Sequence, residues 1–518
     1  MKRIKLLFVL FCTVHALSAQ TILPTPEVFI VNKGEYRMPG HVKVSVNDTQ
    51  SYFLPFMKEV LKAQVGSSMS VSKNPDKGDI VFILDKSKAD EAYELTINPK
   101  KIEIRASGEG GFFYAVQSIN QLLIGNSSGK LPCAVIKDAP RYKLRSFLLD
   151  SGRQYQKVST IKKYLDMMAM LKMNTFHWHL TEGLGWRLEI KKYPELTRKG
   201  AFVGTDAEQQ GFYTQKDVKE IIRYASARNI TVMPEIDMPG HAEAALAAYP
   251  QFSCFGQSPG LKKGQAFSEN IFCAGKPQTM TFLKDVLNEV CELFPSNYIH
   301  VGGDEAPKGN WNRCPDCQAL IKRKNLKNSE QLQAYFSADI AGYLKSKGKK
   351  AVFWDEVLNE EDYELPDNVV VHWWGYRARK EKPLFTAIKK GYEVICGTNY
   401  YTYLNFPLTP WKGYQENRTV DIRQIYEQNP SMNRDSNSLV IGMSCALWTD
   451  DNVRESMIDQ RLFPRIFALA EQMWYRGQLI SFEDYYKKIQ QVRPYFEKLG
   501  YEYGPGLRSE VPANYSWE

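Results

Sequence analysis

The sequence predicts an α/β fold: a (β/α)8 TIM barrel preceded by a small α+β domain. From residue 144 onward, eight short apolar runs rich in Val, Ile, Phe and Trp occur, and helical patterns separate several of them. Eight strands with helical crossovers in about 330 residues are typical of such a barrel. Polar and aromatic residues gather where these strands end, which is where barrels of this type carry their sites.

A small N-terminal domain is expected over residues 20–140, after a signal peptide at residues 1–19. The opening "MKRIKLLFVLFCTVHALSAQ" has a basic start, an apolar stretch too short to span a membrane, and small residues before Gln20. The runs "GDIVFIL" and "YELTINPKKIEIRAS" predict strands, the latter with a turn at Asn98 and Pro99, and "GEGGFFYAVQSINQLL" predicts a helix. We therefore expect an exported protein, periplasmic or secreted, without a membrane span.

The barrel is expected over residues 141–477. Its predicted strands are "LRSFLLDSG", "MNTFHWHL", "TVMPEID", "NYIHVGGDE", "KAVFWDEV", "VVVHWWG", "EVICGTN" and "VIGMSCALW". Between them, "TQKDVKEIIRYASARN" opens a helix with a capping box from Thr214 to Asp217. A helix over 457–474 would close the barrel, and residues 478–518 would form a C-terminal helix and tail packing on it.

The composition excludes a disordered or fibrous chain, because 43% of the residues are hydrophobic, 13% aromatic and 24% charged. The formal net charge is +9, from 67 basic and 58 acidic side chains. No stripe of Lys and Arg with interleaved aromatic residues occurs, so nucleic acid is not an expected partner. The oligomeric state stays open.

Eight of the nine cysteines lie beyond the predicted signal peptide. Cys254 and Cys273 flank a loop rich in Gly and Ser, and a disulfide that closed it would stabilise the fold by about 3 kcal/mol. "CPDC", from Cys314 to Cys317, has the spacing of half a zinc site, but no second C-x-x-C completes it. A local disulfide or two free thiols is therefore favoured, and neither a metal nor a cofactor is expected.

All eight predicted strands end in polar or aromatic residues. In chain order these are Asp150 and Arg153; His177, Trp178 and His179; Glu235, Asp237 and His241; Asp304 and Glu305; Trp354, Asp355 and Glu356; His372, Trp373 and Trp374; Tyr400, Tyr401 and Tyr403; Trp448 and Asp450. Each alone has a plain structural explanation, such as a cap or a core residue, but agreement across eight ends indicates one site. Aromatic rings, carboxylates and an arginine together suit a sugar.

Asp304 and Glu305, in "HVGGDEAP", are the candidate catalytic pair. Two carboxyl groups near one bond suit glycoside hydrolysis, and the usual scheme places them on opposite sides of the sugar carbon. Adjacent residues beside flexible glycines would instead diverge into one pocket, where they are poorly placed to flank a bond. Their adjacency indicates that the two acids have roles different from those of the usual pair.

The motifs closely resemble those of glycoside hydrolase family 20, the β-N-acetylhexosaminidases. The matching stretches, from about residue 25 to 505, are "RSFLLDSGRQY", "NTFHWHLTEGLGWRLEI", "VMPEIDMPGHAEAAL", "HVGGDEAP", "FWDE", "YTYLN" and "ALWTD". The resemblance implies exo-acting removal of terminal, non-reducing β-linked N-acetylglucosamine or N-acetylgalactosamine from glycans by substrate-assisted retaining hydrolysis. Asp304 would then orient the 2-acetamido group that attacks the anomeric carbon, and Glu305 would be the general acid and base.

The same resemblance assigns the other site residues to substrate binding. Arg153 would hold sugar hydroxyls, and Tyr403 would donate to the acetamide carbonyl. Asp237 and His241 would support the acids. Trp354, Trp373 and Trp448 would surround the sugar. The predicted substrate-binding residues are Arg153, His179, Asp237, His241, Trp354, Trp373, Tyr403, Asn405, Trp448 and Asp450.

Three positions depart from the family pattern. An Asp is usual where Glu182 stands, which leaves its contact with His241 open. An Asp is also usual where Asn405 stands, and a Glu where Asp450 stands. The last two would face the 4- and 6-hydroxyls, so a roomier, less anionic corner suggests a substituted sugar such as 6-sulfated N-acetylglucosamine. Unchanged specificity is the alternative.

Two other interpretations remain open. A metal-dependent hydrolase would use "HWH", which places His177 and His179 on one face of a strand. Against it, no compact set of three ligands with a free carboxylate stands out. A non-catalytic sugar-binding protein on the same fold would explain the three departures, although both acids are present.

Overall fold

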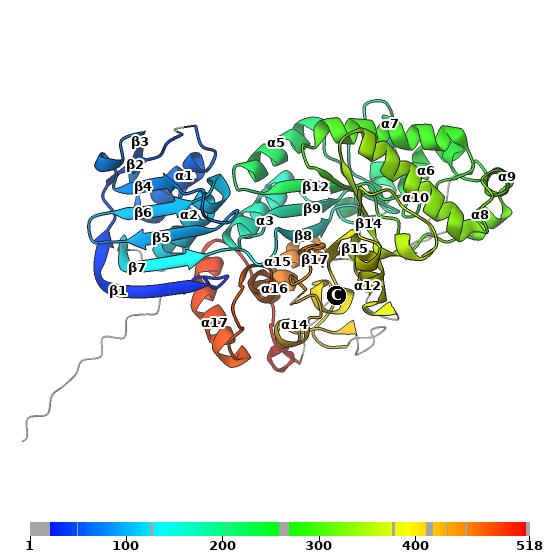
Figure 1. Cartoon of the computed structure of the whole chain (residues 1–518). Coiled ribbons are helices and arrows are strands. Elements are labelled where there is room, and N and C mark those ends of the chain that lie inside the picture. Colours follow the sequence, from blue (N-terminus) through cyan, green and yellow to red (C-terminus); the bar gives the residue numbers. More distant parts are fainter. Residues whose placement is uncertain are drawn as a thin grey trace, which may run out of the picture.

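The structure is a computed structural model that describes residues 21–513, except 49, 125–127, 205, 258–268, 376–378, 411–417, 433 and 451–452. A sheet domain precedes a barrel, and a C-terminal helix lies beside both (Figure 1). The predicted signal peptide lies outside the described residues. Among the described helices, none combines the length and apolar character that a membrane span requires.

The N-terminal domain is a seven-stranded mixed sheet with two helices. Its strand order is β1-β7-β5-β6-β4-β2-β3. The runs predicted as strands form β4, β5 and β6, and a hydrogen bond from Asn98 N–H to the Lys101 carbonyl closes the predicted turn. The strands are β1 (Val28–Arg37), β2 (His41–Ser45), β3 (Ser68–Ser72), β4 (Ile80–Leu84), β5 (Tyr93–Ile97), β6 (Ile102–Ala106) and β7 (Lys130–Asp138), and the helices are α1 (Phe53–Val65) and α2 (Glu109–Ile124).

Helix α2 is buried along almost its whole length because it packs against both the sheet and the barrel. A buried ion pair joins the two domains at this interface: Lys172 Nζ lies 2.6 Å from Asp138 Oδ2. Trp474 Nε1 donates to the other oxygen of Asp138 at 2.9 Å. Charged groups removed from water need such partners, so the domains are held in one arrangement.

Eight parallel strands close the predicted barrel. Each pairs with the next along the chain, and the last pairs with the first. The carboxyl ends of all eight therefore meet at one rim. The strands are β8 (Leu144–Asp150), β9 (Thr175–His179), β12 (Thr231–Glu235), β13 (Tyr298–His300), β14 (Lys350–Trp354), β15 (Val369–Trp373), β16 (Glu393–Cys396) and β17 (Val440–Leu447).

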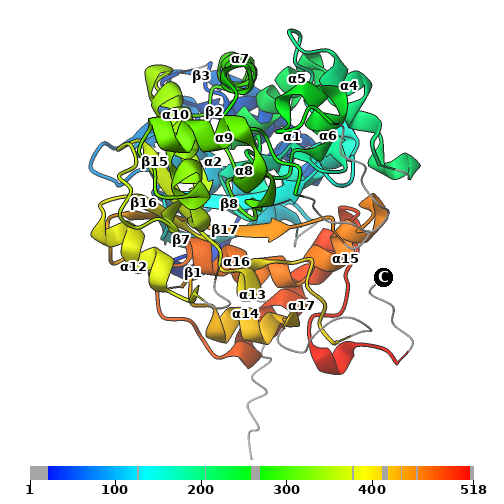
Figure 2. The same ribbon diagram turned by 90° about the vertical axis from the view of Figure 1, so that its right-hand side faces the viewer.

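Helices surround the barrel (Figure 2). The predicted capping box at Thr214 and Asp217 is present at the start of α5. The helix predicted over 457–474 is wrong in one respect: it is split into α15 and α16 at Pro464. Proline lacks the N–H that a helix interior needs, and it disfavours helical geometry in the residue before it. The main helices are α3 (Val158–Met170), α5 (Gln215–Ser226), α7 (Pro277–Leu293), α10 (Ser329–Ser346), α12 (Lys382–Lys389), α14 (Ile422–Gln428), α15 (Ile458–Leu462), α16 (Arg465–Trp474) and α17 (Phe482–Lys498).

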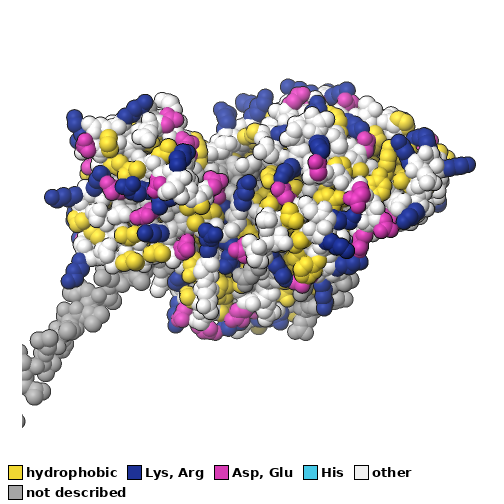
Figure 3. Space-filling model, viewed as in Figure 1, with side chains coloured by type: hydrophobic (Ala, Val, Ile, Leu, Met, Phe, Trp, Pro, Cys, Tyr) yellow, Lys and Arg dark blue, Asp and Glu magenta, His cyan; other side chains and the backbone are white. Residues whose placement is uncertain are grey.

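Shorter elements shape the rim. They are the hairpin β10 (Thr181–Glu182) and β11 (Gly185–Trp186), and the helices α4 (Glu195–Arg198), α6 (Glu243–Ala248), α8 (Gly309–Arg313), α9 (Pro315–Arg323) and α13 (Asn399–Thr402). On the face seen in Figure 3, basic and acidic side chains are interspersed over both domains. That face therefore carries no extended field of a single sign.

Candidate active site

A small cavity of about 110 Å³ lies at the rim where the barrel strands end. The ends of all eight strands or the segments that follow them contribute to it, as the sequence predicts. Every residue predicted for the site lines it except Trp373. The lining residues are Arg153, His179, Glu182, Asp237, His241, Asp304, Glu305, Trp354, Trp374, Tyr403, Asn405, Phe406, Trp448 and Asp450.

The two acids follow a turn that requires glycine. Gly302 and Gly303 both have positive φ, at 63° and 95°. A Cβ at Gly302 would lie 1.9 Å from Asp237 Oδ1, and the same oxygen accepts a hydrogen bond from Gly303 N–H at 3.2 Å. Glu305 itself has a φ of 43°, a conformation that non-glycine residues seldom adopt. This turn brings both adjacent carboxyl groups into the cavity.

Glu182 links the acids to the arginine of the site. Its Oε1 lies 2.7 Å from His241 Nδ1 and 2.5 Å from Arg153 Nη2. Burial alone would raise the pKa of Glu182, but the charges of Arg153 and His241 lower it to about 2. The contact with His241 that the Asp-to-Glu departure left open is therefore present. Gly152 packs closely against this residue, since a Cβ there would lie 2.8 Å from Glu182 Cβ.

His241 connects Glu182 to the two acids. Its Nε2 lies 3.5 Å from Asp304 Oδ2 and 3.8 Å from Glu305 Oε2. Burial would lower the pKa of His241, but Glu182 and Asp304 raise it well above its ordinary value. A histidine with that pKa stays positively charged at neutral pH. It thus offsets the negative charge on the turn.

The two acids occupy different environments. The side chain of Asp304 is 14% exposed and that of Glu305 is 39% exposed. Burial, followed by the charge of Asp304, raises the pKa of Glu305. Asp304 Oδ1 is buried and accepts no hydrogen bond from any residue that the structure describes. One acid therefore tends to keep its proton, and the other presents an acceptor to the cavity.

Aromatic rings form the walls of the cavity. Trp354 donates from Nε1 to Glu235 Oε1 at 2.9 Å, which fixes the ring at the cavity floor. Trp448 lies beneath the Arg153 guanidinium, 5.4 Å from the ring centre. Burial, followed by the charge of Asp304, raises the pKa of Tyr403 well above its ordinary value, so its hydroxyl remains a donor. Rings and donors of this kind fit a pyranose.

Trp374, rather than Trp373, belongs to the cavity lining. Trp373 is the last residue of β15, is fully buried, and donates from Nε1 to the Lys380 carbonyl. Successive strand residues point to opposite faces, so its neighbour turns the other way. Asp355 Oδ2 accepts from Trp374 N–H at 3.0 Å, and Glu356 Oε2 accepts from Trp374 Nε1 at 2.8 Å. The prediction chose the wrong member of a Trp-Trp pair, which alternation could have corrected. Phe406, also in the lining, carried no chemical signal in the sequence.

The histidines considered for a metal site lie mainly in the barrel interior. His177, His300 and His372 are fully or almost fully buried, and His177 and His300 contact Glu235 within 3.0 Å. Burial lowers the pKa of His177 to about 4. His179 also contacts Glu235, at 2.6 Å, and of these four only His179 lines the cavity. These histidines and Glu235 form a buried floor beneath the site.

Asn405 and Asp450, two of the positions that depart from the family pattern, contact each other at one corner of the cavity. Asn405 Nδ2 donates to Asp450 Oδ1 at 3.0 Å, and the charge of Asp450 also acts on Arg153. Asn405 is 2% exposed, so its amide cannot move freely away from this contact. The corner therefore holds one carboxylate and one amide, close to the arginine.

Barrel, rim and cavity together define a carbohydrate-active (β/α)8 protein, and comparisons with known proteins agree. The family description "Glycosyl hydrolase family 20, catalytic domain" matches residues 142–476, and "Glycosyl hydrolase family 20, domain 2" matches residues 19–139. The chain belongs to glycosyl hydrolase family 20.

This chain matches different shares of the length of its individual relatives. The chain is 35% identical to a β-hexosaminidase of Porphyromonas gingivalis over 457 residues, which is 82% of this chain and 56% of that protein. It is 52% identical to the solved β-N-acetylhexosaminidase of Bacteroides fragilis, with a TM-score of 0.91, covering 96% of this chain and all of the other. An exo-β-N-acetylglucosaminidase of Vibrio harveyi, solved with N-acetylglucosamine, is 26% identical, with a TM-score of 0.82 over 94% of this chain and 78% of the other.

Replacing Glu182 by Gln should lower stability by about 3 kcal/mol at pH 5.5, because it leaves Arg153 and His241 with less negative charge. The lowered pKa of Glu182 contributes stability above its ordinary value of 4.5 that is lost as pH falls through about 2. The raised pKa of His241 contributes stability below its ordinary value of 6.5 that is lost as pH rises through the folded value. Thermal melts from pH 2 to 9 should therefore show the largest difference between wild type and variant from about pH 4.5 to 6.5.

Glu182→Asp is the matched control, since it keeps the charge and shortens the reach. A difference in melting temperature that stays constant from pH 2 to 9 would contradict the assigned network.

Proposed function

We propose that the protein is an exo-acting β-N-acetylhexosaminidase that releases terminal, non-reducing β-linked N-acetylglucosamine or N-acetylgalactosamine. The observation that carries this proposal is the pairing of Asp304 and Glu305 in one small cavity. Because the acids are neighbours, they do not flank a bond as two-carboxylate hydrolysis requires. A nucleophile supplied by the substrate resolves this, and a 2-acetamido group is such a nucleophile. The small cavity suits a single terminal sugar.

In the proposed reaction the acetamido oxygen attacks the anomeric carbon. Asp304 Oδ1, which lacks a partner among the described residues, accepts the acetamide N–H and stabilises the positive charge of the oxazolinium intermediate. Glu305 transfers its proton to the glycosidic oxygen as the C–O bond breaks. Glu305 then takes a proton from water, which opens the intermediate with overall retention. Tyr403 would donate to the acetamide oxygen.

The substitutions Glu305→Gln and Asp304→Asn should separate these roles. Without its general acid, the first variant should lose roughly 10²- to 10⁴-fold in kcat/KM on an alkyl glycoside, and much less on a nitrophenyl glycoside whose leaving group needs little protonation. The second should lose activity on both substrates. Glu292→Gln, on an exposed side chain of α7, is the control.

The pH profile gives a second readout. Activity should fall as pH rises through the raised pKa of Glu305, since the proton donor is then lost. In Asp304→Asn that limb should move to lower pH, because the neighbouring charge no longer raises the pKa. If Glu305→Gln lost the same factor in kcat/KM on the alkyl glycoside as on the nitrophenyl glycoside, the result would oppose the proposal. Sugar binding without turnover by the wild type on gluco or galacto substrates would favour a binding protein.

We also propose that the corner formed by Asn405 and Asp450 accepts a substituted 6-position, such as a 6-sulfate. Asn405 brings no charge where the family usually has a carboxylate, and the nearby Arg153 is positive. An anionic substituent would therefore meet less repulsion here. This proposal rests on the assignment of the corner to the 4- and 6-hydroxyls.

Asn405→Asp should lower kcat/KM for a 6-sulfated N-acetylglucosaminide at least tenfold relative to the unsubstituted glycoside, which corresponds to about 1.4 kcal/mol. Measuring both substrates side by side corrects for a general loss of activity, and Asn405→Ala separates the added charge from the lost amide. A wild type that strongly prefers the unsubstituted glycoside would eliminate the idea.

We propose, finally, that the protein is exported, because its first residues have the features of a signal peptide. N-terminal sequencing of the protein recovered from expressing cells should begin at Gln20, consistent with cleavage after Ala19. A mature chain that starts at Met1 in the cytoplasm would contradict this.

A further inference from the structure

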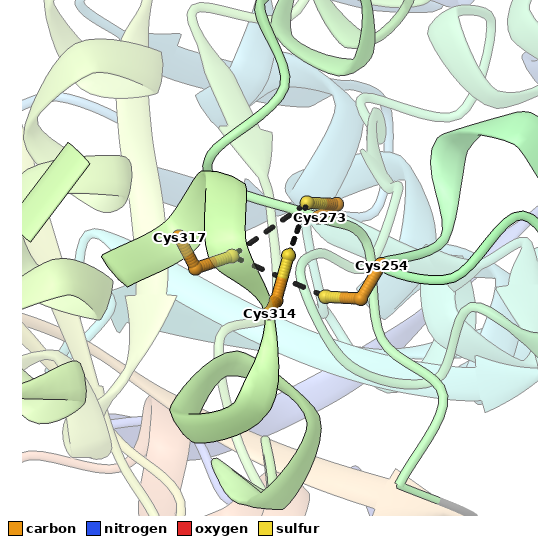
Figure 4. A group of neighbouring side chains, drawn as sticks. All are labelled: Cys254, Cys273, Cys314 and Cys317. Atoms are coloured by element: carbon orange, nitrogen blue, oxygen red, sulfur yellow. Dashed lines mark hydrogen bonds between the residues drawn. The ribbon is translucent and has the colours of Figure 1, made fainter. Parts of the chain in front are cut away.

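Four cysteines from the segments that follow β12 and β13 converge in one cluster (Figure 4). Cys254 and Cys273 lie in the segment that follows α6, and Cys314 and Cys317 lie at the start of α9. Their sulfur atoms point toward a common centre. All four side chains are buried, with 7% exposure for Cys254 and none for the others.

The spacing of the sulfurs is that of ligands around one ion. The Sγ–Sγ distances are 4.0 Å for Cys254 and Cys317, 3.7 Å for Cys273 and Cys314, and 3.6 Å for Cys273 and Cys317. Four sulfurs placed tetrahedrally about 2.3 Å from a zinc ion lie about 3.8 Å apart. Disulfide sulfurs are about 2.05 Å apart.

Of the two alternatives favoured for Cys314 and Cys317, this structure shows the free thiols. Cys254 and Cys273 are not joined by a disulfide, and all eight described cysteines are free thiols. The motif from Cys314 to Cys317 does have a second half, although it is not another C-x-x-C. The fold supplies it from Cys254 and Cys273, which are far apart in the sequence from each other and from the motif.

We propose that Cys254, Cys273, Cys314 and Cys317 bind one Zn²⁺ ion as a structural site. Four thiolates favour zinc over harder ions such as magnesium or calcium, and they complete its tetrahedral shell. A shell with no open position fits a structural ion rather than a catalytic one. The site is separate from the proposed hydrolytic function and does not depend on it.

The surrounding backbone is shaped for this site. Gly275 packs so closely on the helix start that a Cβ would lie 2.2 Å from the Asp316 carbonyl carbon. Trp311 Nε1 donates to the Phe272 carbonyl at 2.9 Å, and Phe272 N–H donates to the Pro239 carbonyl at 2.9 Å. An ion here would therefore join the segment after β12, which carries His241, to the segment after β13, which carries Glu305.

Metal analysis of the purified full-length protein tests the proposal directly. We expect one equivalent of zinc per chain, retained through dialysis and released when a chelator is added with denaturant. Protein reconstituted with Co²⁺ should show the absorption of a tetrahedral cobalt-thiolate site. Native mass spectrometry without reductant should show the intact chain plus one zinc ion. Metal-free protein whose mass is lower by four hydrogens, the signature of two disulfides, would overturn the proposal, as would four reactive thiols without metal.

Single cysteine variants test which residues bind the ion. Cys314→Ser and Cys273→Ser should lose the zinc equivalent and melt at lower temperature. Cys133→Ser, which removes a buried cysteine of the N-terminal domain, should keep the full equivalent. If the ligand variants do not fold, the cobalt spectrum and the metal content of the wild type still decide. Full zinc content in a folded Cys314→Ser variant would show that the ion sits elsewhere.

Discussion

Repulsion between two adjacent carboxyl groups in one small cavity is the constraint around which this site is arranged. Two unit charges about 4 Å apart repel by about 4 kcal/mol at an effective dielectric constant of 20. The raised pKa of Glu305 lowers part of this cost, because burial and the neighbouring charge favour the protonated form of that acid. His241 removes more, since its Nε2 faces both acids as a cation. Its charge in turn depends on Glu182, whose other contact is Arg153.

A second buried carboxylate supports the floor. Glu235 accepts contacts from three histidines and from Trp354, and none of these side chains is more than about 2% exposed. A buried carboxylate without such partners would be strongly unfavourable, so the barrel interior must supply all of them. The arrangement fixes Trp354 and His179 from below. These contacts hold the floor of the cavity, whereas most of the other lining residues lie in the segments beyond the strands.

The sequence predicted most of this because barrel topology turns chain position into spatial position. A residue at the end of any parallel strand lies on one rim, so Asp304, Arg153 and Tyr403 could be grouped before any contact was known. Which of two neighbouring side chains at a strand end faces the cavity is harder to predict, and Trp374 lines it where the sequence indicates Trp373. The sulfur cluster was missed for a different reason. Its two pairs of cysteines come together only because the loops after β12 and β13 pack against each other. The spacing of cysteines along the sequence gives no sign of that packing.

The location of this cluster bears on how the catalytic turn keeps its shape. His241 and Glu305 both have positive φ, at 49° and 43°, and such conformations persist only where the surroundings over-determine them. Both lie in long segments beyond the strands, which are ordinarily the less stable parts of a barrel. Hydrogen bonds through Phe272 already tie the two segments together. An ion held by two cysteines from each segment would add a link that neither hydrogen bonds nor apolar packing supply. The strained residues and the proposed metal site thus belong to one arrangement, in which a rigid outer connection preserves an unfavourable inner geometry.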